Sequence, residues 1–160
     1  MGLTTHNYSY RLDTLQKIKK NGIDVFIGGG DKNRVSMAEL AGIYRESKFV
    51  INFSGKPDSI IQCKGRVVEA TLSGACLIER NNPETNHWLT PNVDYLPYDC
   101  LNEIPDKINQ MLQNPERYEA IRSSGQQKAE QNFGAQKTWS RILDFAAQLS
   151  SSRANCINCE

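Results

Sequence analysis

Three short apolar segments, at residues 23–27, 49–53 and 75–78, alternate with longer segments that have the apolar spacing of amphipathic helices. Short strands that are apolar throughout are typical of a parallel sheet buried on both faces. The alternation therefore predicts an α/β fold, with a Rossmann-like parallel sheet and helices on both faces. Ligands of such sheets bind beyond the carboxyl ends of the strands, so the loops 28–35 and 54–64 are expected to carry function.

Glycines and a capping motif mark the ends of the predicted helices. Gly22 and Gly74 are each expected to end a helix, because glycine readily adopts the left-handed conformation found there. Ser36-x-x-Glu39 has the spacing of a capping box, in which each side chain binds a free backbone amide of the first turn. These signals delimit a helix at about 8–20, one beginning after Ser36 and one over about 65–73.

Two weaker segments follow the third apolar segment. Residues 79–92 are predicted to be a long functional loop, because they contain Pro83 and Pro91. Residues 93–98 are predicted to be a weaker strand at the edge of the sheet. The chain is then expected to be wholly helical, with these C-terminal helices packed alongside the sheet.

The domain is predicted to cover residues 1–149, and residues 150–160 are predicted to be a disordered tail that begins in a run of three serines. Residues 2–7 are too polar to form the strand that should precede the first helix. We therefore expect the first strand of the sheet to lie upstream, in a longer parent protein. Without that strand the sheet would expose an unpaired edge, through which the chain could form a homodimer.

Composition excludes several classes of partner. The 160 residues carry a net charge of +1, so no overall field attracts nucleic acid or an anionic membrane. No apolar run approaches the roughly 20 residues that span a bilayer. The five cysteines, an odd number, indicate reduced thiols in a cytoplasmic protein. The pair Cys156 and Cys159 lacks the second pair or the histidines that a zinc site needs, so no metal is expected.

The segment 64–75 concentrates the residues that could bind a charged ligand. It leads from a loop into a helix, and free amides and the helix dipole make such an N-terminus a site for anions. Lys64 and Arg66 are cations placed against that dipole, which indicates that a third, negative group binds there. Glu69 lies one turn after Arg66, and an exposed ion pair between these two residues is the alternative interpretation.

The same segment resembles the R-x-x-E-A-x-x-x-G signature of the C-terminal domain of GT-B glycosyltransferases, and the resemblance is strongest to the spore-maturation-protein-like glycosyltransferases. The likeness extends over most of the chain, in matching order and spacing. It includes Tyr8 and Arg11, residues 22–25, residues 49–54, Glu84, Leu89, residues 93–95, Tyr98, Asp99, residues 114–121 and Gly125.

The resemblance implies that the chain is the donor-binding half of a glycosyltransferase that uses a nucleotide diphosphate sugar, without a metal or other cofactor. Glu69 would bind the ribose hydroxyls, and Arg66 would bind the diphosphate and, with Lys64, stabilise its charge during catalysis. Backbone amides of Ser54, Gly55 and Gly65 would complete the phosphate site, and Glu84 would approach the donor sugar. A retaining mechanism and a separate N-terminal acceptor-binding domain, missing from this chain, are also implied.

Two positions depart from the pattern of the retaining relatives. Ile61 stands where many of them have a second glutamate, and Asn92 stands where they have glycine. The loss at Ile61 favours the alternative that the chain is a non-catalytic nucleotide-binding or assembly module of the same fold. A receiver-like signalling domain is a poorer match, because the first two strands end in Gly and Phe-Ser rather than in acidic residues.

Overall fold

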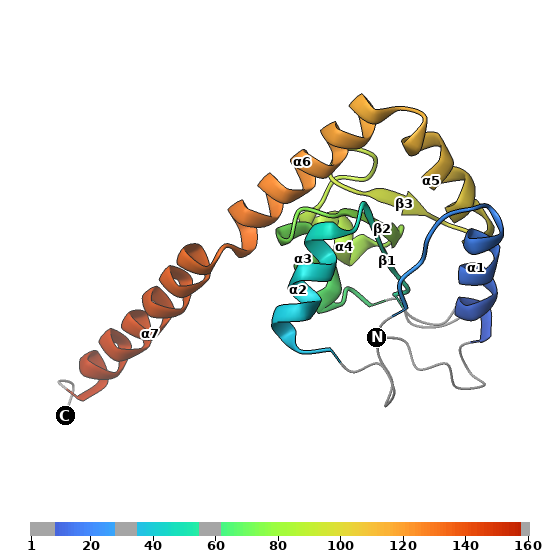
Figure 1. The fold of residues 1–160 in the computed structure, drawn as a ribbon. Helices are drawn as coiled ribbons and strands as arrows, with labels where there is room; N and C mark the ends of the chain where they lie inside the picture. Colours follow the sequence, from blue (N-terminus) through green and yellow to red (C-terminus); the bar gives the residue numbers. More distant parts are fainter. Residues whose placement is uncertain (1–8, 28–34, 55–61, 158–160) are drawn as a thin grey trace.

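The structure is a computed structural model in which residues 9–27, 35–54 and 62–157 are described. Two helices come first, strands and helices then alternate from Phe49 to Tyr98, and the chain after residue 98 is helical (Figure 1). The elements are α1 Ser9–Lys20, α2 Met37–Glu46, β1 Phe49–Asn52, α3 Gly65–Leu72, β2 Cys76–Arg80, α4 Pro83–Trp88, β3 Leu96–Tyr98, a 3₁₀ turn Leu101–Glu103, α5 Ile104–Leu112, α6 Pro115–Phe133 and α7 Ala135–Ile157.

Strands β1, β2 and β3 form a parallel sheet in that order. Val50 pairs with Leu77, and Ile78 pairs with Leu96. Helix α3 connects β1 to β2, and α4 lies in the connection from β2 to β3. This arrangement confirms the predicted α/β fold with a parallel sheet, and it brings the carboxyl ends of all three strands to one edge.

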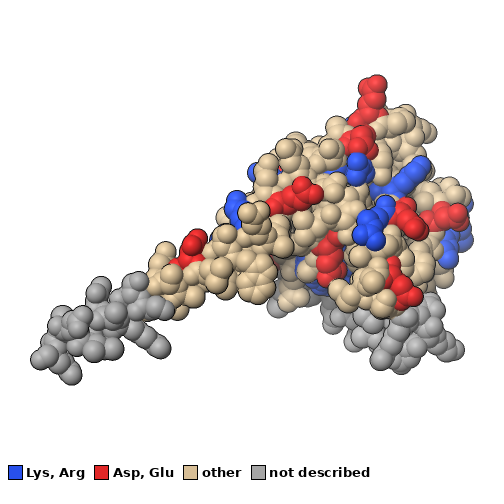
Figure 2. All heavy atoms as spheres, turned by 60° about the vertical axis from the view of Figure 1, so that its left-hand side comes forward, with Lys and Arg blue, Asp and Glu red and all other residues tan. Residues whose placement is uncertain are grey.

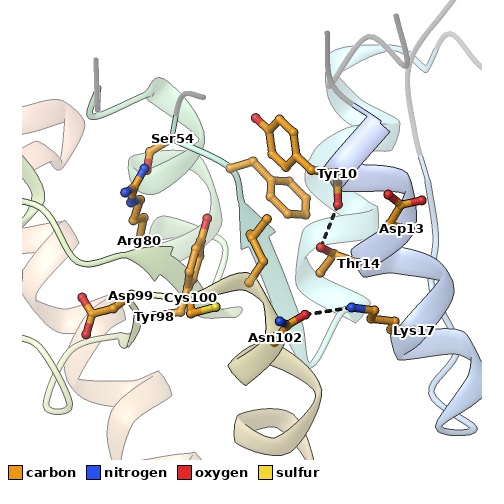
Figure 3. A pocket seen from close by; sticks show the side chains of 12 residues that line it. Tyr10, Asp13, Thr14, Lys17, Ser54, Arg80, Tyr98, Asp99, Cys100 and Asn102 are labelled. Carbon is orange, nitrogen blue, oxygen red and sulfur yellow. Dashed lines mark hydrogen bonds between the residues drawn. The ribbon is translucent and has the colours of Figure 1, made fainter. Parts of the chain in front are cut away.

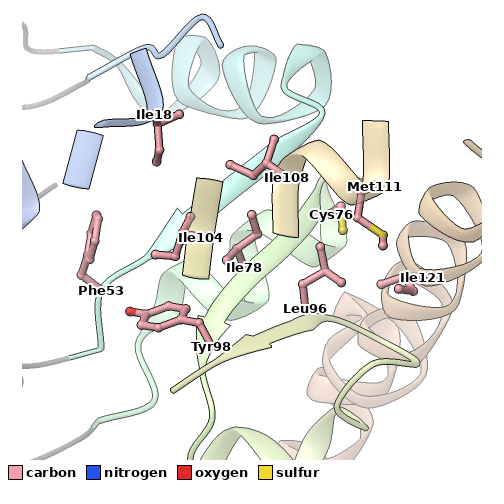
Figure 4. Close-up of a cluster of buried hydrophobic side chains, with 10 residues drawn as sticks. All are labelled: Ile18, Phe53, Cys76, Ile78, Leu96, Tyr98, Ile104, Ile108, Met111 and Ile121. Atoms are coloured by element: carbon pink, nitrogen blue, oxygen red, sulfur yellow. The ribbon is translucent and has the colours of Figure 1, made fainter. Parts of the chain in front are cut away.

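Two hydrophobic clusters cover the two faces of the sheet. On one face, side chains of α1, α5 and α6 pack against Ile78 and its neighbours (Figure 4). On the other face, α2 and α3 pack against Val50 and Leu77. Because side chains alternate along a strand, Asn52 and Glu79, each two residues further on, are directed to the α2–α3 face. Two polar side chains therefore lie on an otherwise apolar face.

The predicted ends of α1 and α3 and the predicted start of α2 are confirmed. Gly22 and Gly74 have φ angles of 77° and 79°, in the left-handed region. The backbone amide of Ser36 donates to Glu39 Oε2 at 2.7 Å, and the amide of Glu39 donates to Ser36 Oγ at 3.2 Å, which completes the capping box. Asn92 has a φ of 62°, so asparagine does adopt the conformation for which the relatives use glycine.

The prediction of a strand at 23–27 is wrong. Ile23 and Val25 pack against the hydrophobic cluster that contains Ile78 and side chains of α1, α5 and α6. However, Phe26 is 59% exposed, and no described residues pair with this segment in a sheet. An apolar sequence forms a strand only where a neighbouring strand satisfies its backbone groups. In the described part of the chain, the sheet therefore has three strands.

The prediction of a loop at 79–92 is also wrong, because β2 extends to Arg80 and helix α4 follows. Asn82 Oδ1 accepts a hydrogen bond from the amide of Thr85 at 2.9 Å, and Pro83 occupies the first turn of the helix. Proline is favoured at that position, so the residue that indicated a loop in fact begins a helix. The predicted edge strand is shorter than 93–98, since β3 contains only Leu96–Tyr98.

Helix α6 packs on the sheet and on α3, whereas α7 extends away from the rest of the domain (Figure 1). Helix α7 continues to Ile157, into the segment 150–160 for which we predicted disorder. Its large apolar side chains up to Leu149 are exposed, and Trp139 is 63% exposed. Among the described helices, none combines the length and the apolarity needed to cross a lipid bilayer.

Close packing of α6 gives a test of the fold. A Cβ atom at Gly125 would overlap the carbonyl oxygen of Asp94, whereas a Cβ at Gly42 in α2 would meet no atom within 4 Å. Gly125→Ala should lower the free energy of unfolding by about 1–3 kcal/mol. The control Gly42→Ala should raise it by about 0.5–1 kcal/mol, because alanine favours the helix. Urea denaturation measures both, and equal effects of the two substitutions would contradict the packing of α6.

Candidate functional site

The carboxyl ends of β1 and β2 meet the N-terminus of α3. Chain direction explains this: β1 ends at Asn52, the chain enters α3 at Gly65, and after α3 it returns along β2, which runs parallel to β1. Lys64 is the N-cap residue of α3, and its side chain makes no capping hydrogen bond. The first amides of the helix therefore have no side-chain acceptor from the N-cap, which leaves them available to an anion.

Two cationic side chains lie at this helix start, as predicted, and both are half-buried. Arg66 Nη1 donates a hydrogen bond to Asn52 Oδ1 at 3.1 Å, and Lys64 Nζ donates to the carbonyl oxygen of Phe53 at 3.0 Å. Burial lowers the pKa of both side chains. Neither cation is paired with a carboxylate in the described part of the chain, where the salt bridges are Lys107–Glu103 and Arg122–Glu119. Positive charge at the helix start is thus without a carboxylate partner.

Glu69 is exposed on α3, one turn after Arg66. The two residues form no ion pair, so the alternative interpretation of the signature as a surface salt bridge is not what the structure contains. The carboxylate lies close to the helix start, because a Cβ atom at Gly65 would be 3.5 Å from Glu69 Oε1. Glu69 and Gly65 therefore belong to the same small surface as the two cations.

Glu84 belongs to a helix rather than to the predicted loop. It lies in the first turn of α4, and its Oε2 accepts a hydrogen bond from the backbone amide of Cys63 at 2.8 Å. The side chain thereby holds the segment that leads into α3. Ser54 is buried at the end of β1, whereas Gly55 and Ile61 lie outside the described residues.

Glu79, which the sequence interpretation missed, occupies the centre of this region. It is 0% exposed and pairs in register with Asn52 on β1. Asn82 Nδ2 donates a hydrogen bond to Glu79 Oε1 at 3.3 Å. Three buried atoms, Glu79 Oε2, Asn52 Nδ2 and Ser54 Oγ, have no hydrogen-bond partner among the described residues. A glutamate directly after the buried strand 75–78 was the signal that could have revealed it.

Burial raises the pKa of Glu79 from 4.5 to about 7. The polar groups of Ser54 and Asn52 and the charges of Lys64 and Arg66 act in the opposite direction, but their effect is smaller. Ser54 and Asn52 lie near enough to favour the charged carboxylate, yet neither forms a hydrogen bond of normal geometry with it. The carboxyl group therefore changes its charge near neutral pH, in contact with the residues of the predicted site.

A cavity of about 440 Å³ adjoins the helix start, between α1 and the carboxyl ends of β1 and β3 (Figure 3). Ser54 lines it, while Lys64, Arg66 and Glu69 do not, so the cavity is a neighbour of the cationic site. The lining residues combine aromatic, charged and amide groups: Tyr10, Asp13, Thr14, Lys17, Phe53, Ser54, Arg80, Tyr98, Asp99, Cys100, Leu101 and Asn102.

Charge on the visible face of the molecule is mixed rather than concentrated. Figure 2 shows basic and acidic side chains interspersed over that face, in keeping with the net charge of +1. Among the described residues, no group of three or more His, Cys, Asp or Glu side chains could hold a metal ion. The local arrangement at α3, rather than an extended field, is what could attract an anion.

A parallel sheet with helices on both faces defines a Rossmann-like domain, in which ligands are commonly bound at the carboxyl ends of the strands. Residues 4–144 match the family model described as glycosyl transferase-like, and the chain belongs to this family. No curated protein matches the chain at a significant level.

Two solved structures share the fold of the C-terminal half of GT-B glycosyltransferases. The C-terminal domain of LpcC, a glycosyl transferase group 1 family protein from Francisella tularensis, superimposes with a TM-score of 0.58 at 16% identity, over 82% of this chain and 66% of that one. Alr3699/HepE from Anabaena, crystallised in complex with UDP-glucose, gives a TM-score of 0.64 at 16% identity, over 91% of this chain. The chain spans 38% of the HepE chain.

The buried carboxyl group predicts how stability depends on pH. A pKa of about 7 in the folded state, against 4.5 for the ordinary group, means that stability falls as pH rises through 7. Wild type should lose on the order of 2–3 kcal/mol of unfolding free energy between pH 5 and pH 8 relative to Glu79→Gln, whose neutral amide resembles the protonated acid. Urea denaturation at both values measures this. The exposed control Glu46→Gln should follow wild type, and an equal decline in Glu79→Gln would refute the assignment.

Proposed function

We propose that this chain binds a nucleotide diphosphate sugar at the N-terminus of α3 and serves as the donor-binding domain of a glycosyltransferase. The observation that carries the proposal is the pair of half-buried cations, Lys64 and Arg66, which lie at an uncapped helix start without a carboxylate partner among the described residues. A diphosphate supplies the negative charge that this arrangement lacks. The amide of Gly65, and those of Ser54 and Gly55, would bind further phosphate oxygens.

Glu69 is assigned to the ribose of the donor. Its carboxylate is exposed, makes no ion pair in the described part of the chain and lies over the start of α3. A carboxylate accepts two hydrogen bonds at once, which suits the neighbouring hydroxyls of a ribose ring. The diphosphate on the amides and the ribose on Glu69 would thus be held by one turn of one helix.

The proposed reaction is transfer of the sugar from the nucleotide diphosphate to an acceptor. Arg66, Lys64 and the amides of α3 would stabilise the negative charge that develops on the leaving diphosphate, without a metal ion. In the GT-B architecture the acceptor is held by a second Rossmann-like half, so transfer would need such a half in addition to these residues. Retention of configuration, a cytoplasmic location and the likeness to the spore-maturation-protein-like group belong to this proposal.

The cavity beside α1 extends the proposed site. It adjoins the helix start through Ser54, and its 440 Å³ falls within the about 300–1,000 Å³ common for small-molecule sites. Tyr10, Phe53 and Tyr98 supply aromatic surface, and Asp13 supplies a carboxylate, a mixture that can bind a sugar ring by stacking and hydrogen bonds. We assign it to a part of the donor beyond the diphosphate.

A non-catalytic nucleotide-binding module is the second candidate function. One observation favours it: Glu84, predicted to approach the donor sugar, has one carboxylate oxygen engaged by the amide of Cys63. Isoleucine at position 61 also replaces the second glutamate of many retaining relatives, so fewer free carboxylate oxygens are expected near the sugar. The two functions share the same nucleotide site and differ in whether transfer follows binding.

Substitution of Glu69 tests the ribose assignment. Glu69→Ala should weaken binding of the preferred nucleotide diphosphate sugar by about 1.5–3 kcal/mol, roughly 10- to 150-fold, the scale of hydrogen bonds to a charged group. Isothermal titration calorimetry with UDP-, GDP- and ADP-glucose measures the effect. Glu46→Ala, which removes an exposed glutamate at the end of α2, is the matched control and should leave affinity unchanged. If Glu69→Ala binds every donor as wild type does, the ribose assignment is wrong.

Substitution of Arg66 tests the diphosphate assignment. Arg66→Lys keeps the charge but loses the planar fork, so affinity for a nucleoside diphosphate should fall about tenfold while affinity for the bare nucleoside stays the same. Competition binding compares the two ligands, and Arg117→Lys, on the exposed side of α6, is the control. Equal losses for both ligands would show that Arg66 acts only through its hydrogen bond to Asn52.

A further inference from the structure

Asn52, Ser54 and Glu79 form a cluster of buried polar side chains, and the proposed function does not explain why this cluster is there. Each residue contributes one buried atom without a hydrogen-bond partner in the described part of the chain, and all three lie at the carboxyl ends of β1 and β2. Buried polar atoms without partners are rare and unfavourable, so a cluster of three calls for an explanation. We propose that Glu79 is a positioning residue of the donor site, which takes up a proton when a diphosphate binds at the start of α3. This inference rests on the proposed function.

A short chain of contacts connects Glu79 to the expected phosphate site. Arg66 Nη1 donates to Asn52 Oδ1 at 3.1 Å, and this bond fixes the orientation of the Asn52 amide. Asn52 is the register partner of Glu79, and both side chains are directed to the face that α3 covers. Any movement of Arg66 toward a ligand therefore acts on the residue next to the buried carboxyl group.

Charge couples the two ends of this chain of contacts. Lys64 and Arg66 are the positive charges that favour the ionised form of Glu79, against the larger effect of burial. A diphosphate would engage the same two cations and add negative charge nearby, and both changes disfavour the carboxylate. Ligand binding would therefore raise the pKa of Glu79 from about 7, and the carboxylate would take a proton from the solvent.

The neutral acid can still form hydrogen bonds with Ser54 and Asn52, although both favour the carboxylate. A protonated carboxyl group offers one O–H donor and retains acceptor capacity on both oxygens. The hydroxyl oxygen of Ser54 can accept a hydrogen bond from that O–H group. The side-chain amide of Asn52 can donate a hydrogen bond to the other carboxyl oxygen. Protonation of Glu79 thus need not leave these atoms without partners, and the changed hydrogen bonds would act on Asn52 and, through it, on Arg66.

The tyrosine and cysteine side chains around Glu79 stay uncharged between pH 6 and pH 8. Tyr95 and Tyr98, beside and within β3, and Cys63, before α3, all have a pKa raised by burial and by the charge of Glu79, so they stay neutral. Lys64 has its pKa lowered by burial and by Arg11, but Glu79 favours its charged form. In this group, Glu79 is the residue whose charge changes near neutrality.

Proton uptake on binding is the direct test. Calorimetric titration at pH 7 in two buffers of different ionisation enthalpy gives the number of protons taken up. The ligands are UDP-, GDP- and ADP-glucose, whose esterified phosphates do not titrate in this range. Wild type should take up a fraction of a proton, at most about one half when the free group is half ionised, and its affinity should fall several-fold from pH 6 to pH 8. Glu79→Gln should take up none and should lose this part of the pH dependence, which a purely structural role would not remove.

The outcomes separate this inference from the function on which it rests. If a donor binds but wild type and Glu79→Gln take up the same number of protons, the inference is overturned and the donor site stands. If none of the three donors binds wild type, both fail. Should Glu79→Gln not fold, ¹³C NMR of the carboxyl resonance of Glu79 in wild type gives its titration midpoint with and without donor. An upward shift supports the inference, and an unchanged midpoint overturns it.

Discussion

Parallel pairing of β1 with β2 across α3 is the constraint on which the site depends. The register places Asn52 directly beside Glu79 and brings both to the start of the helix that connects the two strands. Hydrogen bonds from Arg66 and Lys64 then tie the helix start back to the end of β1. A shift in this register would separate the cations from the strand ends and would turn Glu79 to the opposite face of the sheet.

The face of the sheet under α3 combines apolar packing, which stabilises the fold, with buried polar side chains, which destabilise it. Val50, Val67 and Leu77 form an apolar cluster there, which stabilises the fold by removing apolar surface from water. Asn52 and Glu79 interrupt that cluster with polar groups that are only partly hydrogen bonded. Such groups lower stability, and they are retained most readily where a binding site needs them. The buried polar residues that lower stability thus lie next to the proposed donor site.

Local signals predicted most of the helix boundaries, whereas features that depend on neighbouring elements were missed. The capping box at Ser36, the end of α3 at Gly74 and the placement of Arg66 at a helix start all follow from short-range chemistry. The segment 23–27 has an apolar sequence but no described strand beside it, so its pattern alone was misleading. The sequence did not predict a role for Glu79, because a charged residue after a strand is ordinarily solvated. Its burial becomes clear only once α3 is packed on the sheet.

Mapping of a bound donor onto the backbone tests the central claim most directly. In two-dimensional NMR spectra of the wild-type chain, titration with UDP-, GDP- and ADP-glucose reports each amide separately. The account predicts that at least one donor shifts the amide resonances at the start of α3, Gly65 to Val67, together with that of Ser54, more than those of the other described elements. Shifts confined to residues remote from the carboxyl ends of β1 and β2, or no shifts with any of the three donors, would contradict it.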